Sequence, residues 1–223
     1  MMLNLKYISN SKKGIERGKN QDRILIIEND SYYLFLIFDG VSSNPYSYLF
    51  IDEYIKNVKS KLKDIKKLED YNLSIILYEA HKEILTSNMS GMSTLCVLFF
   101  NKLINNVKFI NIGDSRIYLF SNQYLEQITT DDNLYGRKNI ITKCLGLNTI
   151  TLDDFKMNDV ESGTNFLMCT DGFYCLMEES IKEYFEIINF RYFRNIERKL
   201  SILQRKKNKD DSSYIIIKNE VSN

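Results

Sequence analysis

The chain has 223 residues, and its 30 basic and 29 acidic side chains give a formal net charge of +1, too small for a general attraction to nucleic acids or acidic membranes. A hydrophobic fraction of 44% and a charged fraction of 26% are those of an ordinary globular protein, and the length favours one domain over residues 1–223. With no signal-peptide core and no apolar run near the ~20 residues of a membrane span, we expect a cytoplasmic protein without membrane or nucleic-acid partners.

The N-terminal part of the chain predicts strands and then a pair of helices. Apolar periodicity predicts, in order, strands over 3–9, 23–28 and 32–38 and helices over 48–62 and 68–86. The second and third strands are separated by a short polar segment that contains Asn29 and Asp30, so we expect them to form a hairpin. The lysines of the helical pair fall on polar positions and indicate a solvated face rather than a docking surface.

The remainder of the chain predicts more strands, then helices and a last strand. Short apolar runs predict strands over 94–100, 106–112, 116–121 and 124–129, which we expect to form an antiparallel meander. A short helix over 139–144, strands over 151–157 and 165–169, helices over 173–177, 180–188 and 192–204, and a strand over 213–218 follow. This order is typical of an α+β domain in which helices cover antiparallel sheets.

Acidic residues stand at the ends of several predicted strands. The apolar run YYLFLIFDGVSS (32–43) ends in Asp39-Gly40, which alone would favour a turn. A second apolar run, NFLMCTDG, ends in the same pair at Asp171, and Asp22, Asp114 and Asp210 border other strands. Because an unpaired carboxylate at the edge of an apolar core is costly, and hard divalent cations choose oxygen ligands, the repetition predicts a Mg²⁺ or Mn²⁺ site.

The histidine and cysteine content, together with the absence of some short motifs, excludes several kinds of functional site. His81 is the sole histidine and lies in an amphipathic helical stretch, so zinc-finger and H-E-x-x-H sites are absent. The sequence also lacks a G-x-S-x-G elbow, a P-loop and a G-x-G-x-x-G loop. The four cysteines are dispersed without a C-x-x-C pair, which favours reduced core thiols, although the sequence leaves disulfides open.

Six stretches, taken together and in chain order, carry a resemblance to a known family. They are RGKNQD (17–22), IFDGVSS (37–43), INIGDSRIYLF (110–120), KNIITKCLG (138–146), MCTDGF (168–173) and KDDSSYIII (209–217). Any one of them is a weak signal, but their order and their placement at strand ends resemble the metal-dependent protein serine/threonine phosphatases, the PPM or type 2C family. This resemblance spans almost the entire chain.

The resemblance implies a fold and a reaction. The fold would be a central antiparallel β-sandwich flanked by helices, in four layers α-β-β-α, with metal ions held between the sheets at one end. The reaction would be hydrolysis of phosphoserine or phosphothreonine in a bacterial signalling protein, opposing a cognate protein kinase. Water activated by two Mn²⁺ or Mg²⁺ ions would attack phosphorus directly, without a covalent enzyme intermediate.

The resemblance also implies roles for individual residues. Asp39 would bridge the two ions, and the Gly40 carbonyl would bind one of them. Asp171 and Asp210 would bind the other ion. Asp22 would act at one remove, through water.

Arg17 would be the phosphate-binding residue, and Arg17 and Asp39 are together the residues expected to be catalytic. The planar guanidinium matches phosphate oxygens better than an ammonium group does. Without the motif, a surface arginine in a polar loop would be the plainer interpretation of Arg17.

Two positions depart from the family pattern near these ligands. Asp114 and Asp171 would form a weak third metal site, but the acid that usually completes it, four residues after the second Asp-Gly aspartate, is here Cys175. Asp211 stands where the family usually has asparagine, and its charge would either tighten a cation or face solvent.

The largest departure is a shortened segment. Between TTDDN and KNIITKCLG, where the family commonly has a helical flap, the flap segment is nearly absent and only residues 133–137 remain. We expect a more open metal cleft with a changed basis for substrate choice.

Two alternatives to a protein phosphatase stay open. The eroded glycine turns at Ser42-Ser43 and Met92, together with Cys175 and the missing flap, allow a catalytically weak or inactive pseudophosphatase that binds phosphoproteins or regulates a partner. Retention of every primary ligand argues against it. An open cleft would also admit a small phosphorylated metabolite.

Overall fold

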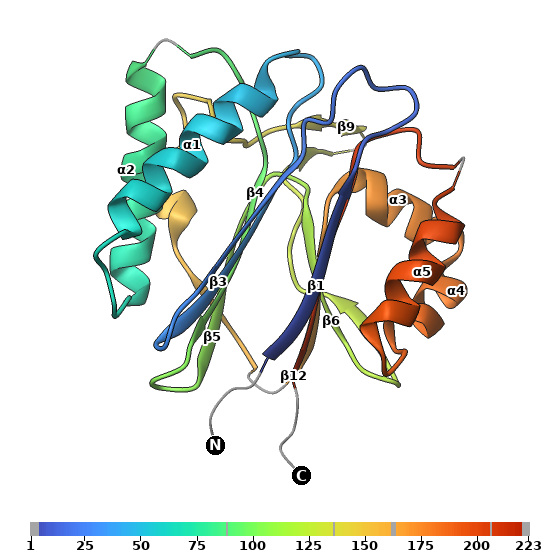
Figure 1. Ribbon diagram of the computed structural model, residues 1–223. Coiled ribbons are helices and arrows are strands. Elements are labelled where there is room, and N and C mark those ends of the chain that lie inside the picture. Colours follow the sequence, from blue (N-terminus) through green and yellow to red (C-terminus); the bar gives the residue numbers. More distant parts are fainter. Residues whose placement is uncertain (1–4, 88, 136, 162–163, 206, 220–223) are drawn as a thin grey trace.

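The computed structural model describes residues 5–87, 89–135, 137–161, 164–205 and 207–219 and has a layered architecture (Figure 1). One antiparallel sheet has the strand order β10-β5-β4-β3-β2, built from β2 (Arg23–Glu28), β3 (Tyr32–Phe38), β4 (Leu95–Asn101), β5 (Asn106–Ile112) and β10 (Asn158–Val160). The other has the order β1-β12-β11-β6-β7, built from β1 (Leu5–Lys12), β6 (Arg116–Phe120), β7 (Leu125–Gln127), β11 (Asn165–Cys169) and β12 (Ser212–Asn219).

Helices cover the outer face of each sheet, so the predicted four-layer α-β-β-α sandwich is confirmed (Figure 1). The first sheet is covered by α1 (Ser47–Leu62) and α2 (Asp70–Thr86), and the second by α3 (Asp171–Glu179), α4 (Ile181–Ile188) and α5 (Phe193–Leu203). Among the described residues, none of the helices combines the length and apolar character needed to cross a bilayer.

The strand β3 is buried along its entire length because it has a core on each face. Leu34 and Leu36 pack under α1 and α2, whereas Phe35 and Ile37 fill the space between the two sheets. Burial on both faces explains why this strand is a continuous apolar run instead of an alternating one. The predicted hairpin of residues 23–28 and 32–38 is confirmed with unchanged ends, and Asn29 Oδ1 accepts backbone N–H bonds at its turn.

The predicted meander over residues 94–129 is wrong in one respect. β4 pairs with β5 and β6 pairs with β7, but β5 and β6 belong to different sheets. The chain crosses between the sheets at Gly113, whose φ of +105° is a conformation that favours glycine. Both strands thereby bury apolar side chains between the sheets, and Asp114 comes to lie at the end of the sandwich.

The predicted helix over 139–144 is wrong, and part of this segment is β9 (Arg137–Ile141), which pairs with β8 (Asn133–Leu134). Thr142 fixes the end of this hairpin, since its backbone N–H and its hydroxyl both donate to the Asp132 carbonyl, at 2.7 and 2.8 Å. The β-branched run Ile140-Ile141-Thr142 favours extended backbone.

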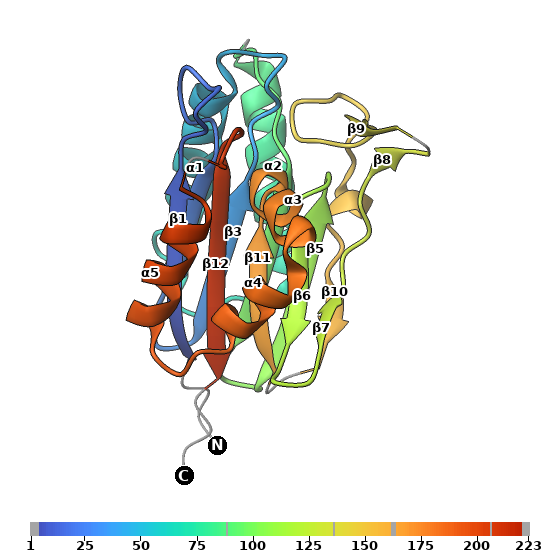
Figure 2. The ribbon, with the colours of Figure 1, turned by 90° about the vertical axis from the view of Figure 1, so that its right-hand side faces the viewer.

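The β8–β9 hairpin lies in the segment in which we expected the helical flap to be nearly absent. It projects from the body of the sandwich (Figure 2). Its two strands are short, and the side chain of Tyr135 at its tip is fully exposed. The shortened segment therefore forms a small two-stranded projection.

The predicted strand over 151–157 is also wrong. Residues Leu152–Phe155 form a 3-10 helix, η1, and the following strand is the short β10. A capping box explains the helix, because the Thr151 and Asp154 side chains each accept a hydrogen bond from the other residue's backbone. The remaining predicted strands and helices are present with ends shifted by a few residues, and residues 3 and 4 of the first strand lie outside the described residues.

Candidate active site

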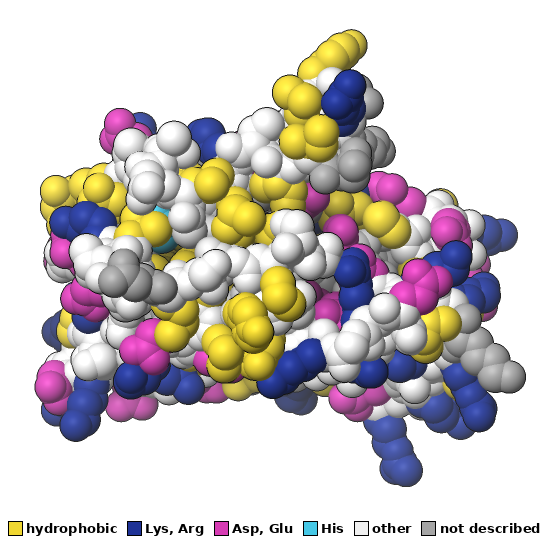
Figure 3. All heavy atoms as spheres, turned by 90° about the horizontal axis from the view of Figure 1, so that it is seen from above, with side chains coloured by type: hydrophobic (Ala, Val, Ile, Leu, Met, Phe, Trp, Pro, Cys, Tyr) yellow, Lys and Arg dark blue, Asp and Glu magenta, His cyan; other side chains and the backbone are white. Residues whose placement is uncertain are grey.

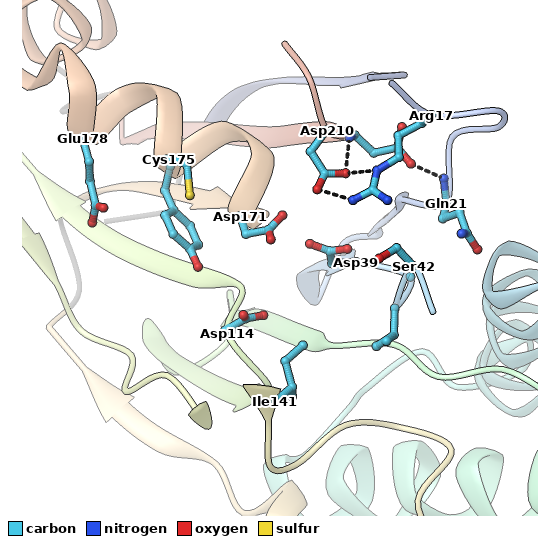
Figure 4. Close-up of a pocket in the computed structure, with 14 residues that line it drawn as sticks. Arg17, Gln21, Asp39, Ser42, Asp114, Ile141, Asp171, Cys175, Glu178 and Asp210 are labelled. Atoms are coloured by element: carbon cyan, nitrogen blue, oxygen red, sulfur yellow. Dashed lines mark hydrogen bonds and ion pairs between the residues drawn. The ribbon is translucent and has the colours of Figure 1, made fainter. Parts of the chain in front are cut away.

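A cavity of about 400 Å³ opens at the end of the sandwich where the two sheets meet. Six of the seven expected site residues line it: Arg17, Asp39, Gly40, Asp114, Asp171 and Asp210. Seen from above, acidic and basic side chains gather at this place (Figure 3), and the close-up shows the carboxyl groups of Asp39, Asp114 and Asp171 around one open space (Figure 4).

The two Asp-Gly motifs approach one another from opposite sheets. Asp39 follows β3 and is fixed by Thr94, whose hydroxyl accepts the Asp39 N–H at 3.0 Å and whose N–H donates to the Asp39 carbonyl at 2.9 Å. Asp171 follows β11 and begins α3, where the positive end of the helix dipole favours a carboxylate. Asp39 and Asp171 both line the cavity, and their carboxyl groups interact electrostatically, although the two residues are 132 positions apart in the chain.

Too little positive charge lies near the carboxyl groups of the cavity to offset their negative charges. Burial, and then the nearby Asp171, raise the pKa of Asp39 well above its ordinary value. Burial and Asp210 likewise raise the pKa of Asp171, and burial and Asp171 raise the pKa of Asp114 to about 7. Each of these carboxyls is thus held in a place that favours its neutral form until a cation arrives.

Arg17 is the cationic side chain among the described residues that line this cavity. Its Nε donates to Asp210 Oδ1 at 2.5 Å and its Nη2 donates to Oδ2 of the same carboxylate (Figure 4). This bidentate pairing raises the pKa of Arg17. Arg17, the expected phosphate-binding residue, is therefore paired with Asp210, an expected metal ligand.

Asp211 neither faces solvent nor stands free beside Asp210. It is buried, and its Oδ1 and Oδ2 accept backbone N–H bonds from Gly14 at 2.9 Å and from Gln21 at 2.8 Å. The two bonds tie both ends of the loop that carries Arg17 to the start of β12.

We expect Asp211→Asn to destabilise this attachment. Asparagine offers one carbonyl oxygen, so one of the two N–H groups would face an amide NH₂, and the loss should be about 1–3 kcal/mol. Because the loop positions Arg17, the KM for a phosphate ester should rise as well. Urea unfolding and steady-state kinetics would check this, with Asp30→Asn in the exposed hairpin turn as the matched control; identical behaviour of the two variants would contradict it.

Asp22 does not line the cavity, and its side chain is buried. Its Oδ2 accepts hydrogen bonds from the Thr170 hydroxyl at 3.0 Å and the Ser213 hydroxyl at 2.7 Å. Its Oδ1 has no hydrogen-bond partner among the described residues, and burial raises its pKa. An enclosed carboxylate oxygen without a donor is a position that a water or a cation would satisfy.

Gly40 and Gly172 allow the motifs to approach so closely. A Cβ on Gly172 would stand 2.0 Å from the Asp211 carbonyl oxygen, and a Cβ on Gly40 would stand 2.8 Å from Gln21 Cβ. The glycine of each Asp-Gly pair is therefore required by a neighbouring backbone or side chain at the cavity wall.

Five lining residues were not singled out individually in the sequence: Gln21, Val41, Ile141, Tyr174 and Glu178. Glu178 lies seven positions after Asp171 on α3, and residues at this spacing share one face of a helix. This spacing is the sequence signal that could have identified Glu178. Cys175 lies on the same helix and also lines the cavity.

Arg116, from the GDSR stretch, supports the cavity wall that α3 forms with Tyr174, Cys175 and Glu178. Its guanidinium binds Asp131 at 2.7 Å and Glu178 at 2.6 Å and stacks 3.6 Å from the Tyr174 ring. The side chain is buried, and its part is to hold α3 in place beside Asp114.

The donors suit hard divalent cations, although they are not arranged as a finished cage. No three His, Cys, Asp or Glu side chains within the described ranges stand so that they could hold a metal ion, and Asp210 is engaged by Arg17. The donor set is nevertheless all oxygen, crowded and deficient in positive charge, which is what Mg²⁺ or Mn²⁺ requires. The residues present therefore fit such ions.

The raised carboxyl pKa values predict an unusual pH dependence of stability for the metal-free protein. A carboxyl whose pKa is higher in the folded than in the unfolded state stabilises the fold at low pH, and this contribution is lost as the pH rises through the folded pKa. For Asp114 the window runs from about 4 to about 7. His81 opposes it between about 6.5 and about 4, because burial lowers its pKa to about 4.

With four carboxyls against one imidazole, we expect the free energy of unfolding in chelator to be several kcal/mol lower at about pH 8 than at about pH 5. Saturating Mn²⁺ should remove most of this difference. Urea unfolding at the two pH values would check it, and a metal-free protein that gains stability with rising pH would contradict it.

Comparisons with known proteins agree with this geometry. A family model described as protein phosphatase 2C matches residues 12–207. The serine/threonine phosphatase stp of Listeria monocytogenes is 27% identical over 179 residues, covering 70% of this chain and 67% of that protein, and the stp of Listeria welshimeri is 29% identical over 136 residues, covering 53% and 52%.

Solved structures share the fold. The S. agalactiae serine/threonine phosphatase superposes with a TM-score of 0.80 at 15% identity, covering 97% of this chain and 100% of that chain. The catalytic domain of the serine/threonine protein phosphatase PstP, in complex with two manganese ions, superposes with a TM-score of 0.77 at 19% identity, covering 98% and 99%.

The chain belongs to the protein phosphatase 2C family, as its matched residues and its sandwich of two antiparallel sheets require. Within that family it is a protein serine/threonine phosphatase of the PPM type, related to bacterial enzymes.

Proposed function

We propose that this chain acts, as one catalytic domain, as a metal-dependent hydrolase of phosphoserine and phosphothreonine in proteins modified by a cognate kinase. Asp39, Asp171 and Asp210, with the Gly40 carbonyl, would hold two Mn²⁺ or Mg²⁺ ions, and Asp22 would contribute through water. The manganese ions in the PstP structure support the choice of metal.

One observation carries this proposal: Asp39 and Asp171, which follow strands of opposite sheets, line one cavity that Asp210 also lines. Bringing these acids together raises their pKa values, which costs stability without a cation. Arrangements that cost stability persist at functional sites, so the cluster supports cation binding.

Bound divalent ions would neutralise phosphoryl oxygens and lower the pKa of the attacking water. Arg17 would bind the phosphate of the substrate through the two N–H donors that now face Asp210. Arg17 and a cation therefore compete for Asp210, and Arg17 becomes available for phosphate when Asp210 takes the cation.

A third ion would bind weakly at Asp114 and Asp171. Cys175 follows on the same wall, and burial raises the pKa of its thiol to about 11, so it stays neutral. A neutral thiol is a poor ligand for Mg²⁺ or Mn²⁺.

The metal count tests the proposal without depending on turnover. Native mass spectrometry of the Mn²⁺-loaded protein should show two bound ions. Hydrolysis of p-nitrophenyl phosphate should require Mn²⁺. No bound ions together with no turnover at any Mn²⁺ concentration would reject the proposal in favour of the phosphoprotein-binding alternative.

The substrate class needs a separate comparison. We expect kcat/KM for a phosphothreonine peptide to exceed that for sugar and nucleotide phosphates. The reverse order would assign the site to a small metabolite instead.

A further inference from the structure

Two basic stretches of the chain lie side by side next to the catalytic cavity. Residues 12–19 belong to the end of β1 and the loop that follows it, and residues 205–209 belong to the connection between α5 and β12. Both stretches are at the end of the sandwich away from the chain termini (Figure 1). Together they present six described cationic side chains, which we call the basic platform: Lys12, Lys13, Lys19, Arg205, Lys207 and Lys209. Lys12 is half-buried and the other five are exposed.

Hydrogen bonds of the backbone and of one buried side chain hold the two stretches together. The Ile15 N–H donates to the Asn208 carbonyl at 2.9 Å. The side chain of Asn208 is buried, and its amide donates to the Lys13 carbonyl at 3.3 Å. Gly14 permits this close approach, because a Cβ at that position would stand 2.3 Å from the Lys209 carbonyl oxygen. The fold itself therefore places the two basic stretches next to each other.

Carboxylates offset little of the positive charge of the basic platform. None of the ion pairs between described residues includes a platform side chain. Glu16 is the single acidic residue within residues 12–19 and 205–209. Because the whole chain has a formal net charge of only +1, this surface is a local concentration of positive charge, and mutual repulsion within it costs free energy. An external anion would relieve that repulsion.

The basic platform adjoins the residues that line the catalytic cavity. The Lys13 ammonium donates to the Arg17 carbonyl at 3.0 Å, and Lys209 directly precedes Asp210. Arg17 and Asp210 both line the cavity. A polypeptide whose phosphorylated residue enters this cavity must continue across its rim, at about 3.3 Å per residue when extended. Residues a few positions from the phosphorylated one can therefore reach the platform.

We propose that the basic platform docks a carboxylate-rich segment of the phosphoprotein substrate, close to its phosphorylated residue. This inference deepens the function proposed above and rests on it. Charge complementarity and the continuity of the platform with the cavity of a protein phosphatase favour this occupant. Lysine ammonium groups on flexible stems suit carboxylates at variable positions. Each exposed contact contributes little, so several must act together. Since the platform does not touch the reacting group, it should lower KM and leave kcat unchanged.

Two phosphothreonine peptides of equal length test the proposal. One has two glutamates on each side of the phosphorylated residue, and the other has glutamines at the same positions. With the Mn²⁺-loaded protein at low ionic strength, we expect kcat/KM to be about tenfold higher for the glutamate peptide, through KM. Added salt should reduce this difference, because the platform is exposed to solvent.

A double variant identifies the platform as the cause of the preference. Lys207→Gln with Lys209→Gln should lower kcat/KM for the glutamate peptide about fivefold. It should leave the glutamine peptide and p-nitrophenyl phosphate unchanged. Lys66→Gln with Lys67→Gln is the matched control, since it removes the same charge from two exposed lysines of the α1–α2 connection. The control should behave as the unmodified protein with all three substrates.

Two results would overturn the docking proposal: equal kcat/KM for the two peptides, or equal losses in the two double variants. Turnover of the glutamine peptide and of p-nitrophenyl phosphate reports the catalytic cavity alone, so either result leaves the proposed function standing. An absence of all turnover would instead count against the proposed function.

A binding measurement makes the same comparison without turnover. Fluorescence anisotropy would use both peptides with a non-hydrolysable phosphonate in place of the phosphate, and the glutamate peptide should again bind about tenfold more tightly. Tighter binding of a single-stranded oligonucleotide or of acidic lipid vesicles than of the glutamate peptide would overturn the proposal and assign the platform to nucleic acid or to a membrane.

Discussion

Asp39→Asn is expected to reduce Mn²⁺-dependent hydrolysis of p-nitrophenyl phosphate by at least about 10³-fold, because it removes the charge proposed to bind both ions. The amide keeps the size of the side chain and the two backbone hydrogen bonds with Thr94. The bound-metal count should fall with the activity. Steady-state rates and native mass spectrometry measure the two effects together.

The same substitution should affect stability in the opposite direction. Asp39 is crowded by Asp171, Asp22 and Asp114, so removing its charge from the metal-free protein should raise the free energy of unfolding. Asp64→Asn, at an exposed position, is the matched control and should leave rate, metal count and stability unchanged. An Asp39→Asn protein that keeps its metal-dependent rate would exclude Asp39 as the central ligand.

Gly172→Ala is expected to have the second large effect. It should lower the free energy of unfolding, whereas helix propensity alone would predict an increase. Alanine normally stabilises a helix by roughly 1 kcal/mol over glycine. Here the new Cβ would stand 2.0 Å from the Asp211 carbonyl oxygen and 2.9 Å from its carbon, so the first turn of α3 must move away from β12. We expect a loss of about 1–3 kcal/mol in the free energy of unfolding.

Activity should fall further than stability, because this movement separates Asp171 from Asp210. A displacement near 1 Å at a reacting site costs about 10²-fold in rate. Gly18→Ala is the matched control, since no atom lies within 4 Å of its added Cβ. Unfolding midpoints and kcat at saturating Mn²⁺ would check both parts, and a Gly172→Ala protein as active as Gly18→Ala would contradict this account of the wall.

Local patterns in the sequence were sufficient where the structure depends on near neighbours. The boundaries of β2 and β3 follow from apolar periodicity and the polar turn between them, and the two Asp-Gly pairs mark strand ends. The same patterns failed over 139–144 and 151–157. There, the hydrogen bonds of Thr142 to Asp132 and the capping box of Thr151 decided the conformation over runs too short to show a period.

What the sequence by itself determined is the kind of chemistry: oxygen ligands at strand ends, one arginine with a planar fork, and no histidine placed for catalysis. Only the tertiary structure decided which of these groups meet. The crossing at Gly113 brings Asp114 to the cavity, the hydroxyls of Thr170 and Ser213 hold the buried Asp22, and Arg17 reaches Asp210 across 193 positions. The physical reason is that periodicity reports the contacts of a residue with its neighbours in the chain, whereas the convergence of charges depends on how two separately formed sheets pack.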